Sequence, residues 1–308
     1  MHPQTICIGM YGLNEWFDGD FRSVVELIGL ADRLGIDQIN VPDHVVMGEA
    51  TDKYPYGKFV TPPDYPWVEP LTLLSAAAQA TRRIRLSTGI IIAPLRPAAL
   101  LAKQVATLDM LSGGRVDLGV GVGWQKEEYL ACGLSFEARF ALLDEEMRAC
   151  RTLWSQAPAS FSGRHVSFER LYSKPFPVQG RLPVLLGVAA TPKNVARIAE
   201  YGDGWLPLRE TPEEVRAGIG ALREAFTARG RDPRELQVRA VPQFEFRSDG
   251  LADLEATLAQ IPELFAAGAT GVELYTCMFC RNPQDFEKFC GRLVEFKRSL
   301  PRPARDPD

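Results

Sequence analysis

The fold of this chain is decided by residues 86–129, LSTGIIIAPLRPAALLAKQVATLDMLSGGRVDLGVGVGWQKEEY. They begin with an apolar run over residues 86–92, as expected for a parallel strand that is buried on both faces. Two prolines then start a helix whose apolar side chains form one stripe, and Gly113 ends it. A second buried strand follows at residues 116–122. The stretch therefore predicts a right-handed strand–helix–strand unit whose second strand ends in glycine-rich backbone.

The rest of the chain repeats this alternation. Six further strands are predicted at residues 5–10, 36–41, 184–187, 204–208, 236–241 and 271–276. Further helices are predicted at residues 20–34, 67–81, 136–154 and 192–201, from Thr211 onward, and at residues 251–267 and 283–300. Eight strands alternating with eight helices favour a (β/α)8 TIM barrel, which we expect to form a single domain over residues 1–308.

A doubly wound sheet is the competing architecture, but it would normally carry a glycine fingerprint after its first strand, and none is present there. Two segments do not fit the alternation and are predicted insertions. Residues 45–66, rich in Pro, Gly and Tyr, follow the second strand, and the mixed residues 157–181 precede the fifth. A long insertion in a compact domain is more often functional than idle.

The composition excludes several classes of protein. The 308 residues are 46% hydrophobic and 24% charged with a formal net charge of −4, which argues against nucleic acid as the main partner. No signal-peptide pattern and no apolar run of roughly 18 residues is present. We therefore expect a soluble, cytoplasmic protein that does not bind a membrane. Cys277 and Cys280 have the spacing of half a zinc site, but no second pair exists, so free thiols are expected.

In a TIM barrel, the chemistry lies on the loops that follow the strands. His44 is the only histidine at a predicted carboxyl end of a strand. Histidine ordinarily changes its charge near neutral pH, which suits proton transfer, so we interpret His44 as the catalytic candidate. The alternative is a structural histidine bonded to a carbonyl or to Asp43. No Ser-His-Asp set and no metal-ligand spacing is present, so no metal site is predicted.

The glycines of LGVGVGW, Gly119, Gly121 and Gly123, lack the spacing of a dinucleotide-binding fingerprint. Glycines here would instead clear space for a flat ring above the barrel. Trp124 would lie beside that ring, or else in the core. Glu127 reaches the same region, or belongs to a solvated helix start.

A second ligand signal follows the fifth strand, where the small residues Gly187, Ala189, Ala190 and Thr191 precede a helix. Backbone N–H groups at a helix N-terminus bind anions, and Thr191 adds a hydroxyl. The same residues also fit a plain helix cap, and both roles are compatible. A phosphate-capable loop beside a flat, apolar mouth points to a cofactor with a ring and a phosphate.

Three segments carry a family resemblance: LADRLGIDQINVPDHVV at residues 30–46, the whole of residues 71–129, and VLLGVAATPKNVARIAEYGDGWLP at residues 184–207. In this order and spacing they resemble the luciferase-like monooxygenase superfamily. The motifs SGGR and GDGW are shared by all its branches. The PDHVV segment together with LGVGVGW is most similar to the probable coenzyme F420-dependent oxidoreductases.

The resemblance implies a TIM barrel that binds F420, a 5-deazaflavin. By the same resemblance, Ile90 and Ile91 would form a cis-peptide bulge behind the ring, and His44 would face its reactive edge. Ala190 and Thr191 match the positions that hold the cofactor phosphate. The protein would transfer hydride between F420 and a small organic substrate.

Two further positions bear on ring and substrate. Glu127 falls where some relatives place a polar contact to the ring. Relatives that oxidise sugar phosphates carry a glutamate where this chain has Trp124. The resemblance therefore implies a substrate with an apolar or aromatic face.

Two alternatives stay open at this point. One is an FMN-dependent monooxygenase of the same superfamily, which uses oxygen and receives reduced FMN from a separate reductase. The other is a barrel that binds a cofactor without catalysis. The resemblance also implies a homodimer.

Overall fold

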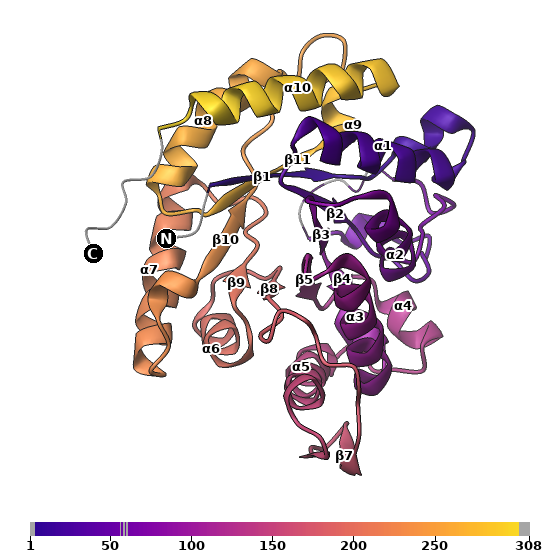
Figure 1. Ribbon diagram of the computed structural model, residues 1–308, viewed down its shortest axis with the longest axis vertical. Coiled ribbons are helices and arrows are strands. Elements are labelled where there is room, and N and C mark those ends of the chain that lie inside the picture. The colour runs from indigo at the N-terminus through magenta and orange to yellow at the C-terminus, as the bar shows by residue number, and fades with distance from the viewer. Residues whose placement is uncertain (1–3, 56, 58, 60, 302–308) are drawn as a thin grey trace.

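Parallel strands close into a barrel that is wrapped by helices (Figure 1). The computed structural model describes residues 4–55, 57, 59 and 61–301. In spatial order the barrel strands are β1 (Thr5–Gly9), β2 (Gln38–Val41), β3 (Arg85–Thr88), β5 (Val116–Gly121), β8 (Val184–Leu186), β9 (Gly204–Trp205), β10 (Gln237–Ala240) and β11 (Gly271–Tyr275). Each strand runs parallel to the next, and β11 pairs with β1. The closed ring confirms the TIM barrel prediction.

The outer helices are α1 (Phe21–Leu34), α2 (Pro70–Ala80), α3 (Ala98–Ser112), α5 (Arg139–Ser155), α6 (Pro192–Tyr201), α7 (Pro212–Ala228), α8 (Leu254–Ala266) and α10 (Pro283–Ser299). Local sequence sets their ends. The Asp20 side chain caps α1, Gly35 ends it with a φ of 100°, and Thr211 and Glu214 form a capping box on α7. Helix α8 starts three residues later than predicted, because Asp253 caps it. No helix in the described part of the chain has the length and apolarity needed to cross a bilayer.

Several short elements escaped the sequence analysis. They are the helices α4 (Lys126–Ala131) and α9 (Thr276–Phe279), the 3-10 turns η1 (Leu13–Phe17), η2 (Thr51–Lys53), η3 (Ala93–Leu95) and η4 (Pro233–Glu235), and the strands β4 (Ile91–Ile92), β6 (Ala159–Ser162) and β7 (Ser167–Leu171). Strands β6 and β7 form an antiparallel hairpin in the second predicted insertion, and Figure 1 shows β7 projecting away from the barrel.

The third barrel strand is interrupted, contrary to the prediction of one continuous run over residues 86–92. Strand β3 ends at Thr88, the Gly89–Ile90 peptide is cis, and β4 then resumes the pairing with β5. The bulge therefore lies one residue before the predicted Ile90–Ile91 pair, and Ile91 is a regular strand residue opposite Val120. Glycine is needed at position 89 because an added Cβ would lie 1.8 Å from the Asn40 amide nitrogen.

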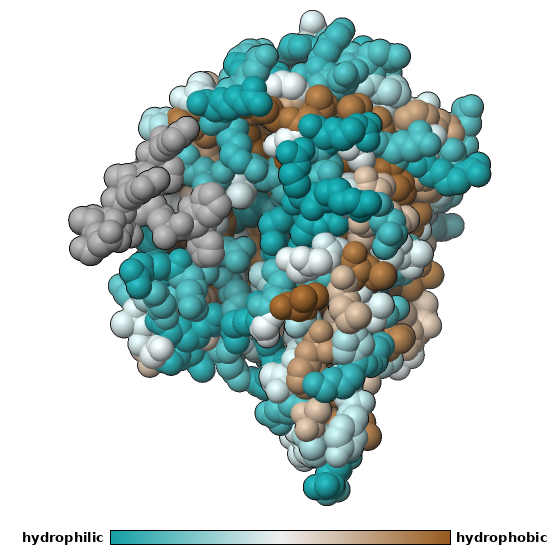
Figure 2. Space-filling view, viewed as in Figure 1, coloured by the Kyte–Doolittle hydropathy of each residue, from teal (hydrophilic) through white to brown (hydrophobic). Residues whose placement is uncertain are grey.

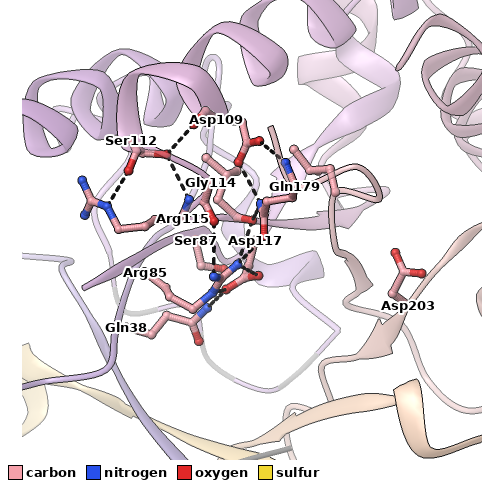
Figure 3. A network of polar contacts seen from close by, with 12 residues as sticks. Gln38, Arg85, Ser87, Asp109, Ser112, Gly114, Arg115, Asp117, Gln179 and Asp203 are labelled. Atoms are coloured by element: carbon pink, nitrogen blue, oxygen red, sulfur yellow. Dashed lines mark hydrogen bonds and ion pairs between the residues drawn. The ribbon is translucent and has the colours of Figure 1, made fainter. Parts of the chain in front are cut away.

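We call the amino ends of the barrel strands the base and their carboxyl ends the mouth. At the base, the SGGR motif leads into β5, and its arginine, Arg115, donates to the carbonyl oxygen of Ile84 at 2.7 Å. Arg85 makes a two-point contact with Asp117 (2.6 Å for each bond), and the Gln38 amide donates to the same carboxylate at 2.5 Å (Figure 3). The motif thus fixes the starts of adjacent strands.

The second shared motif, GDGW, has the same kind of role. Its carboxylate, Asp203, is buried and forms ion pairs with Arg151, with Arg181 at 2.6 Å and with Arg231 at 2.9 Å. Burial alone would raise the pKa of Asp203, but Arg151 and Arg181 hold it below the usual range. Ion pairs at the base of a barrel, away from the loops that carry chemistry, contribute to stability rather than to catalysis.

Polar side chains cover most of the face seen in Figure 2, and apolar side chains gather in the region of helix α3. Leu100, Met110 and Leu111 on this helix are about half exposed. Large apolar side chains exposed together on one helix are unusual on a monomer surface.

Candidate functional site

A cavity of about 860 Å³ opens at the mouth of the barrel, within the usual size range of small-molecule sites. Each barrel strand or the loop after it contributes to the lining. Examples, in chain order, are Tyr11, His44, Ile90, Trp124, Ala189, Leu206, Val241 and Cys277. The convergence of all these loops on one cavity is the usual arrangement of an active site in a TIM barrel.

His44 lines this cavity and is held by a buried carboxylate. Its Nδ1 lies 3.1 Å from Glu128 Oε2, and the Val45 amide donates to Glu128 Oε1 at 3.0 Å. Glu128 is 0% exposed and His44 is 9% exposed. Because a carboxylate accepts hydrogen bonds, Nδ1 carries the proton in this pair and Nε2 is the nitrogen that can exchange a proton with a ligand. His44 is therefore oriented, as a proton-transfer residue requires.

Asp43, the alternative partner considered for His44, is engaged elsewhere. Its carboxylate forms two bonds with Arg96, at 2.7 and 2.9 Å, and accepts from the Ile92 amide at 2.8 Å. Burial alone would lower the pKa of Arg96, but its hydrogen bonds to Asp43 and the charges of Asp43 and Glu69 raise it above the usual value. This pair ties the loop after β2 to the interrupted third strand.

Aromatic rings surround His44. The centroid of Trp67 lies 4.6 Å from the imidazole, that of Phe59 at 5.9 Å, and that of Trp124 at 6.0 Å. Tyr54 continues this wall at 5.3 Å from Trp124. The rings exclude water from one side of the cavity, which strengthens electrostatic interactions inside it.

The described residues between positions 45 and 66, which we call the roof, come from the first predicted insertion and line the cavity. The roof is fastened by several hydrogen bonds, including one from the Val45 amide to Glu128 and one from the Tyr65 hydroxyl to Asn14. The Gln125 amide exchanges two hydrogen bonds with the Gly48 backbone, at 2.7 and 2.9 Å, and the hydroxyl of Thr61 pairs with that of Tyr11. Burial raises the pKa of Tyr11 to about 12, so its hydroxyl stays neutral at physiological pH. The prediction of a functional insertion agrees with this placement.

Ile90 fits a notch made by two of the predicted glycines. A Cβ added to Gly187 would lie 2.6 Å from Ile90 Cγ2, and one added to Gly121 would lie 2.8 Å from Ile90 Cδ1. Both distances are shorter than a van der Waals contact, so glycine at both positions lets Ile90 occupy the notch. Ile90 thus forms a flat apolar wall of the cavity.

The predicted phosphate loop lies at the start of α6. Gly187 and Ala189 line the cavity, whereas Thr191 accepts a hydrogen bond from the Asn194 amide at 3.4 Å as the N-cap of α6. The Asn194 side chain also lines the cavity and donates to the Ala189 carbonyl at 2.9 Å. The loop is therefore fixed beside the cavity by its own cap.

Three cationic side chains line the rim of the cavity: Lys53, Lys126 and Arg139. The Arg139 guanidinium lies 4.0 Å from the ring centroid of Phe136, so its direction is set by stacking. Glu127 lines the same rim. Lys126 also pairs with Glu137 at 3.4 Å, so Lys53 and Arg139 are the rim cations that most favour an anionic part of a ligand.

Of the predicted site residues, the structure brings six together around the cavity: His44, Ile90, Trp124, Glu127, Gly187 and Ala189. The remaining four, Ile91, Gly121, Ala190 and Thr191, are outside the described lining. Sequence reasoning missed the role of Glu128 as the partner of His44. It also missed three polar residues that line the cavity, Asn40, Arg239 and Glu273. Arg239 and Glu273 could have been noticed, because a charged residue within a short apolar strand indicates a polar group that faces inward.

Metal and thiol chemistry receive no support from the described residues. Within that part of the chain, no group of three or more His, Cys, Asp or Glu side chains is arranged to hold a metal ion. All six cysteines are free thiols, as predicted, and burial raises the pKa of Cys277 to about 12. Cys277 lines the cavity as a neutral, weakly reactive group.

The structure is thus a TIM barrel whose mouth holds an oriented histidine and an apolar lining, at the end of the barrel where ligands bind in this fold class. Residues 8–267 match the family described as luciferase-like monooxygenase, and the chain belongs to that family. An uncharacterised protein of Mycobacterium tuberculosis is 40% identical over 183 residues, which are 58% of this chain and 62% of that protein. The chain thus spans about three fifths of the length of this curated relative.

Relatives of known activity divide between two cofactors. An F420-dependent glucose-6-phosphate dehydrogenase of Amycolatopsis mediterranei is 30% identical over 192 residues, 60% of this chain and 53% of the enzyme. An FMNH2-dependent dimethylsulfone monooxygenase of Pseudomonas putida is 29% identical over 198 residues, 63% of this chain and 53% of the enzyme. The crystal structure of monooxygenase RslO1 from Streptomyces bottropensis shares the fold, with a TM-score of 0.75, 21% identity, and coverage of 96% of this chain and 98% of that one.

Proposed function

We propose that this chain is a coenzyme F420-dependent oxidoreductase that transfers hydride between the deazaflavin and a small organic substrate. The observation that carries the proposal is His44, oriented by the buried Glu128 carboxylate in a cavity that Ile90 also lines. A deazaflavin, when bound, supplies two-electron hydride transfer.

The residues around the cavity fit such a cofactor. Ile90, held between Gly121 and Gly187, offers a flat apolar support for a planar ring. In the loop of residues 187–191, the Gly187 and Thr191 N–H groups donate to the Val120 and Ala189 carbonyls, so Ala190 and its neighbour Ala189 supply the backbone N–H groups for a phosphate near the start of α6. The rim cations favour a negatively charged tail, and Glu127 is a polar contact at the ring edge.

His44 exchanges a proton with the substrate at Nε2 while Glu128 holds Nδ1. The Glu128 carboxylate stabilises the charge that the imidazole gains when it takes up a proton. Phe59, Trp67 and Trp124 exclude water and present a largely apolar surface to the substrate. A substrate with an apolar or aromatic face suits this wall better than a sugar phosphate.

The second candidate is an FMN-dependent monooxygenase that receives reduced FMN from a separate reductase. It is favoured by the resemblance to the FMNH2-dependent relative and by the aromatic Trp124 in place of a glutamate. A barrel that binds a cofactor without catalysis is the third candidate. For the assembly, we infer a homodimer that covers the apolar side chains exposed on α3.

The first experiment is a titration of the purified protein with F420 and with FMN, each in oxidised and reduced form. The proposal expects tight F420 binding and no FMN binding. The reverse result supports the monooxygenase, and binding of neither cofactor would overturn both enzymatic functions. Binding followed by no turnover with a panel of alcohols, aldehydes and ketones would favour the non-catalytic barrel.

A matched pair of variants tests whether the ring lies against Ile90. Gly187→Ala places a methyl group 2.6 Å from Ile90 Cγ2, so the wall must shift and cofactor affinity should fall by about tenfold. The control is Gly220→Ala on α7, where an added Cβ has no neighbour within 4 Å. Equal affinities of the two variants would place the ring elsewhere.

A further inference from the structure

The closed end of the cavity is polar, unlike its walls. Asn40 on β2, Arg239 on β10 and Glu273 on β11 come from within the barrel strands, below the loops, and all three line the cavity. Their exposed fractions are 2%, 3% and 5%. We call these three residues the floor.

Hydrogen bonds and an ion pair fix the floor side chains. Glu273 Oε1 accepts from the Asn40 amide nitrogen, and Glu273 Oε2 lies 2.9 Å from Arg239 Nε. Arg239 Nη1 donates to Gln38 Oε1 at 2.9 Å and to Ser87 Oγ at 3.0 Å. Because Asn40 and Arg239 contact the two oxygens of one carboxylate, their side chains lie next to each other.

Three buried polar atoms of the floor have no hydrogen bond within the described residues; one of them, Arg239 Nε, lies 2.9 Å from Glu273 Oε2 in an ion pair. Asn40 Oδ1 and Arg239 Nη2 are buried and have no hydrogen-bond partner among the residues that the structure describes. Buried polar atoms in native proteins are nearly always paired with protein, water or a ligand. Asn40 and Arg239 both line the cavity and both contact Glu273, so the unpaired Asn40 Oδ1 and Arg239 Nη2 indicate a ligand group at the floor.

The chemistry of that group follows from the two atoms. The Asn40 nitrogen is committed to Glu273, so the amide orientation is set and Oδ1 is an acceptor. Arg239 Nη2 is a donor, and its positive charge is compensated by Glu273. A carboxylate or phosphate at the floor would be repelled by Glu273, whereas a neutral group that offers one N–H and one C=O would satisfy both atoms.

We propose that Asn40 Oδ1 and Arg239 Nη2 form a subsite for the neutral N–H and C=O edge of an amide, lactam or imide. The inference rests on the proposed function, since a flavin or deazaflavin ring carries such an edge at the N3–H and adjacent carbonyls of its pyrimidine ring. A substrate lactam carries the same edge, and the experiment separates the two sources.

The test compares ligands with and without the N–H group by calorimetry. The first pair is FMN or F420, whichever binds, against its N3-methyl derivative. The second pair is 2-piperidone against N-methyl-2-piperidone, titrated into both the cofactor-free and the cofactor-loaded protein. Each pair is measured on the wild type, on Asn40→Ala, and on Arg239→Lys, which keeps a cation beside Glu273 but removes Nη2.

Loss of the N–H should weaken binding to the wild type by about tenfold, and both floor variants should reduce this difference. If N-methylation weakens binding of the cofactor, the cofactor ring lies at the floor. If it weakens only the binding of the lactam to the cofactor-loaded protein, the floor binds the substrate. Lys288→Gln, at an exposed position of α10 outside the cavity lining, is the control and should keep the wild-type difference.

Equal binding within both pairs would overturn the inference, because the floor atoms would then be satisfied by water alone. Failure of the proposed function is distinguishable, since it appears as absent binding of both cofactors while the lactam pair still reports on the cofactor-free floor. Thermal unfolding of each variant checks that it folds. If Asn40→Ala does not fold, Arg239→Lys decides the result.

Discussion

The base and the mouth of this barrel use buried charged groups in opposite ways. At the base, Asp117 and Asp203 are bonded to several arginines and amides of the protein itself. At the mouth, His44 has one carboxylate partner, and the floor keeps Asn40 Oδ1 and Arg239 Nη2 without a partner among the described residues. Groups satisfied by the protein hold the strands together, whereas groups left with bonding capacity are available to a ligand.

The difference predicts which substitutions affect stability and which affect chemistry. Changes at the base should lower the free energy of unfolding, and changes at the mouth should lower turnover or affinity in a protein that still folds. Four variants test this division, beginning with the largest expected effect.

His44→Asn should lower turnover on the order of 10²–10⁴-fold, because the proton-transfer group is removed. Cofactor affinity should stay largely unchanged, since the ring is supported by Ile90 and the loop at α6. Turnover is followed by cofactor absorbance with any alcohol, aldehyde or ketone that the wild type converts, and affinity by fluorescence titration. An equal loss of turnover and affinity would mean that His44 is only a binding or structural residue.

Asp203→Ala should destabilise the protein by about 3–5 kcal/mol, because Arg151, Arg181 and Arg231 lose their common partner. Urea denaturation measures the change in the free energy of unfolding. Asp232→Ala is the control, since Asp232 pairs with Arg234 at an exposed site where water screens the pair, so its loss should have a much smaller effect. Similar values for both variants would contradict the structural role given to GDGW.

Glu146 on α5 is a buried carboxyl that has, unlike those at the base, no arginine partner within the described chain, and its Oε2 is unpaired. Burial, aided by the charge of Glu145, raises its pKa from 4.5 to about 8. The folded state therefore holds a proton that the unfolded state releases. The stability that this proton gives to the folded state is fully present below about pH 4.5. It is lost as the pH rises through about 8.

Glu146→Gln carries no titrating proton. Between pH 5.5 and 7.5, the free energy of unfolding should therefore fall less in this variant than in the wild type, and the two changes should differ by on the order of 2 kcal/mol. Urea denaturation at the two pH values measures the difference. Glu224→Gln, an exposed position on α7, should follow the wild type. The same pH dependence in all three proteins would show that Glu146 does not hold the proton.

Thr191→Ala should cost about 1 kcal/mol of stability, because the N-cap of α6 is lost. The ratio of FMN to riboflavin affinity should not change, since backbone N–H groups rather than the hydroxyl are expected to contact the phosphate. Calorimetry with the two ligands measures this ratio. If the ratio falls, the Thr191 hydroxyl itself binds the phosphate. Thr191 would then be a ligand-binding residue as well as a helix cap.

Strand and helix order were predictable because apolar runs and amphipathic stripes depend on local sequence. At the base, the SGGR and GDGW motifs were recognisable in the sequence. The contacts that their side chains make were not. The contact between His44 and Glu128 was not predictable, because barrel closure brings together residues 84 positions apart. Nor was the break at Gly89, because an apolar run does not reveal where the backbone must pass the Asn40 side chain. Arg239 and Glu273 left a visible signal, as charges within otherwise buried strands.

The roof is a segment separate from the barrel framework. It belongs to the connection between β2 and α2, and its contacts with the rest of the protein include the Gly48–Gln125 and Tyr11–Thr61 hydrogen bonds on either side of residues 49–60. Segments of this kind can diverge or be exchanged between homologues while the strand framework stays constant. We therefore expect a chimera that swaps residues 49–60 and keeps both anchor points to alter substrate preference while leaving the cofactor support intact.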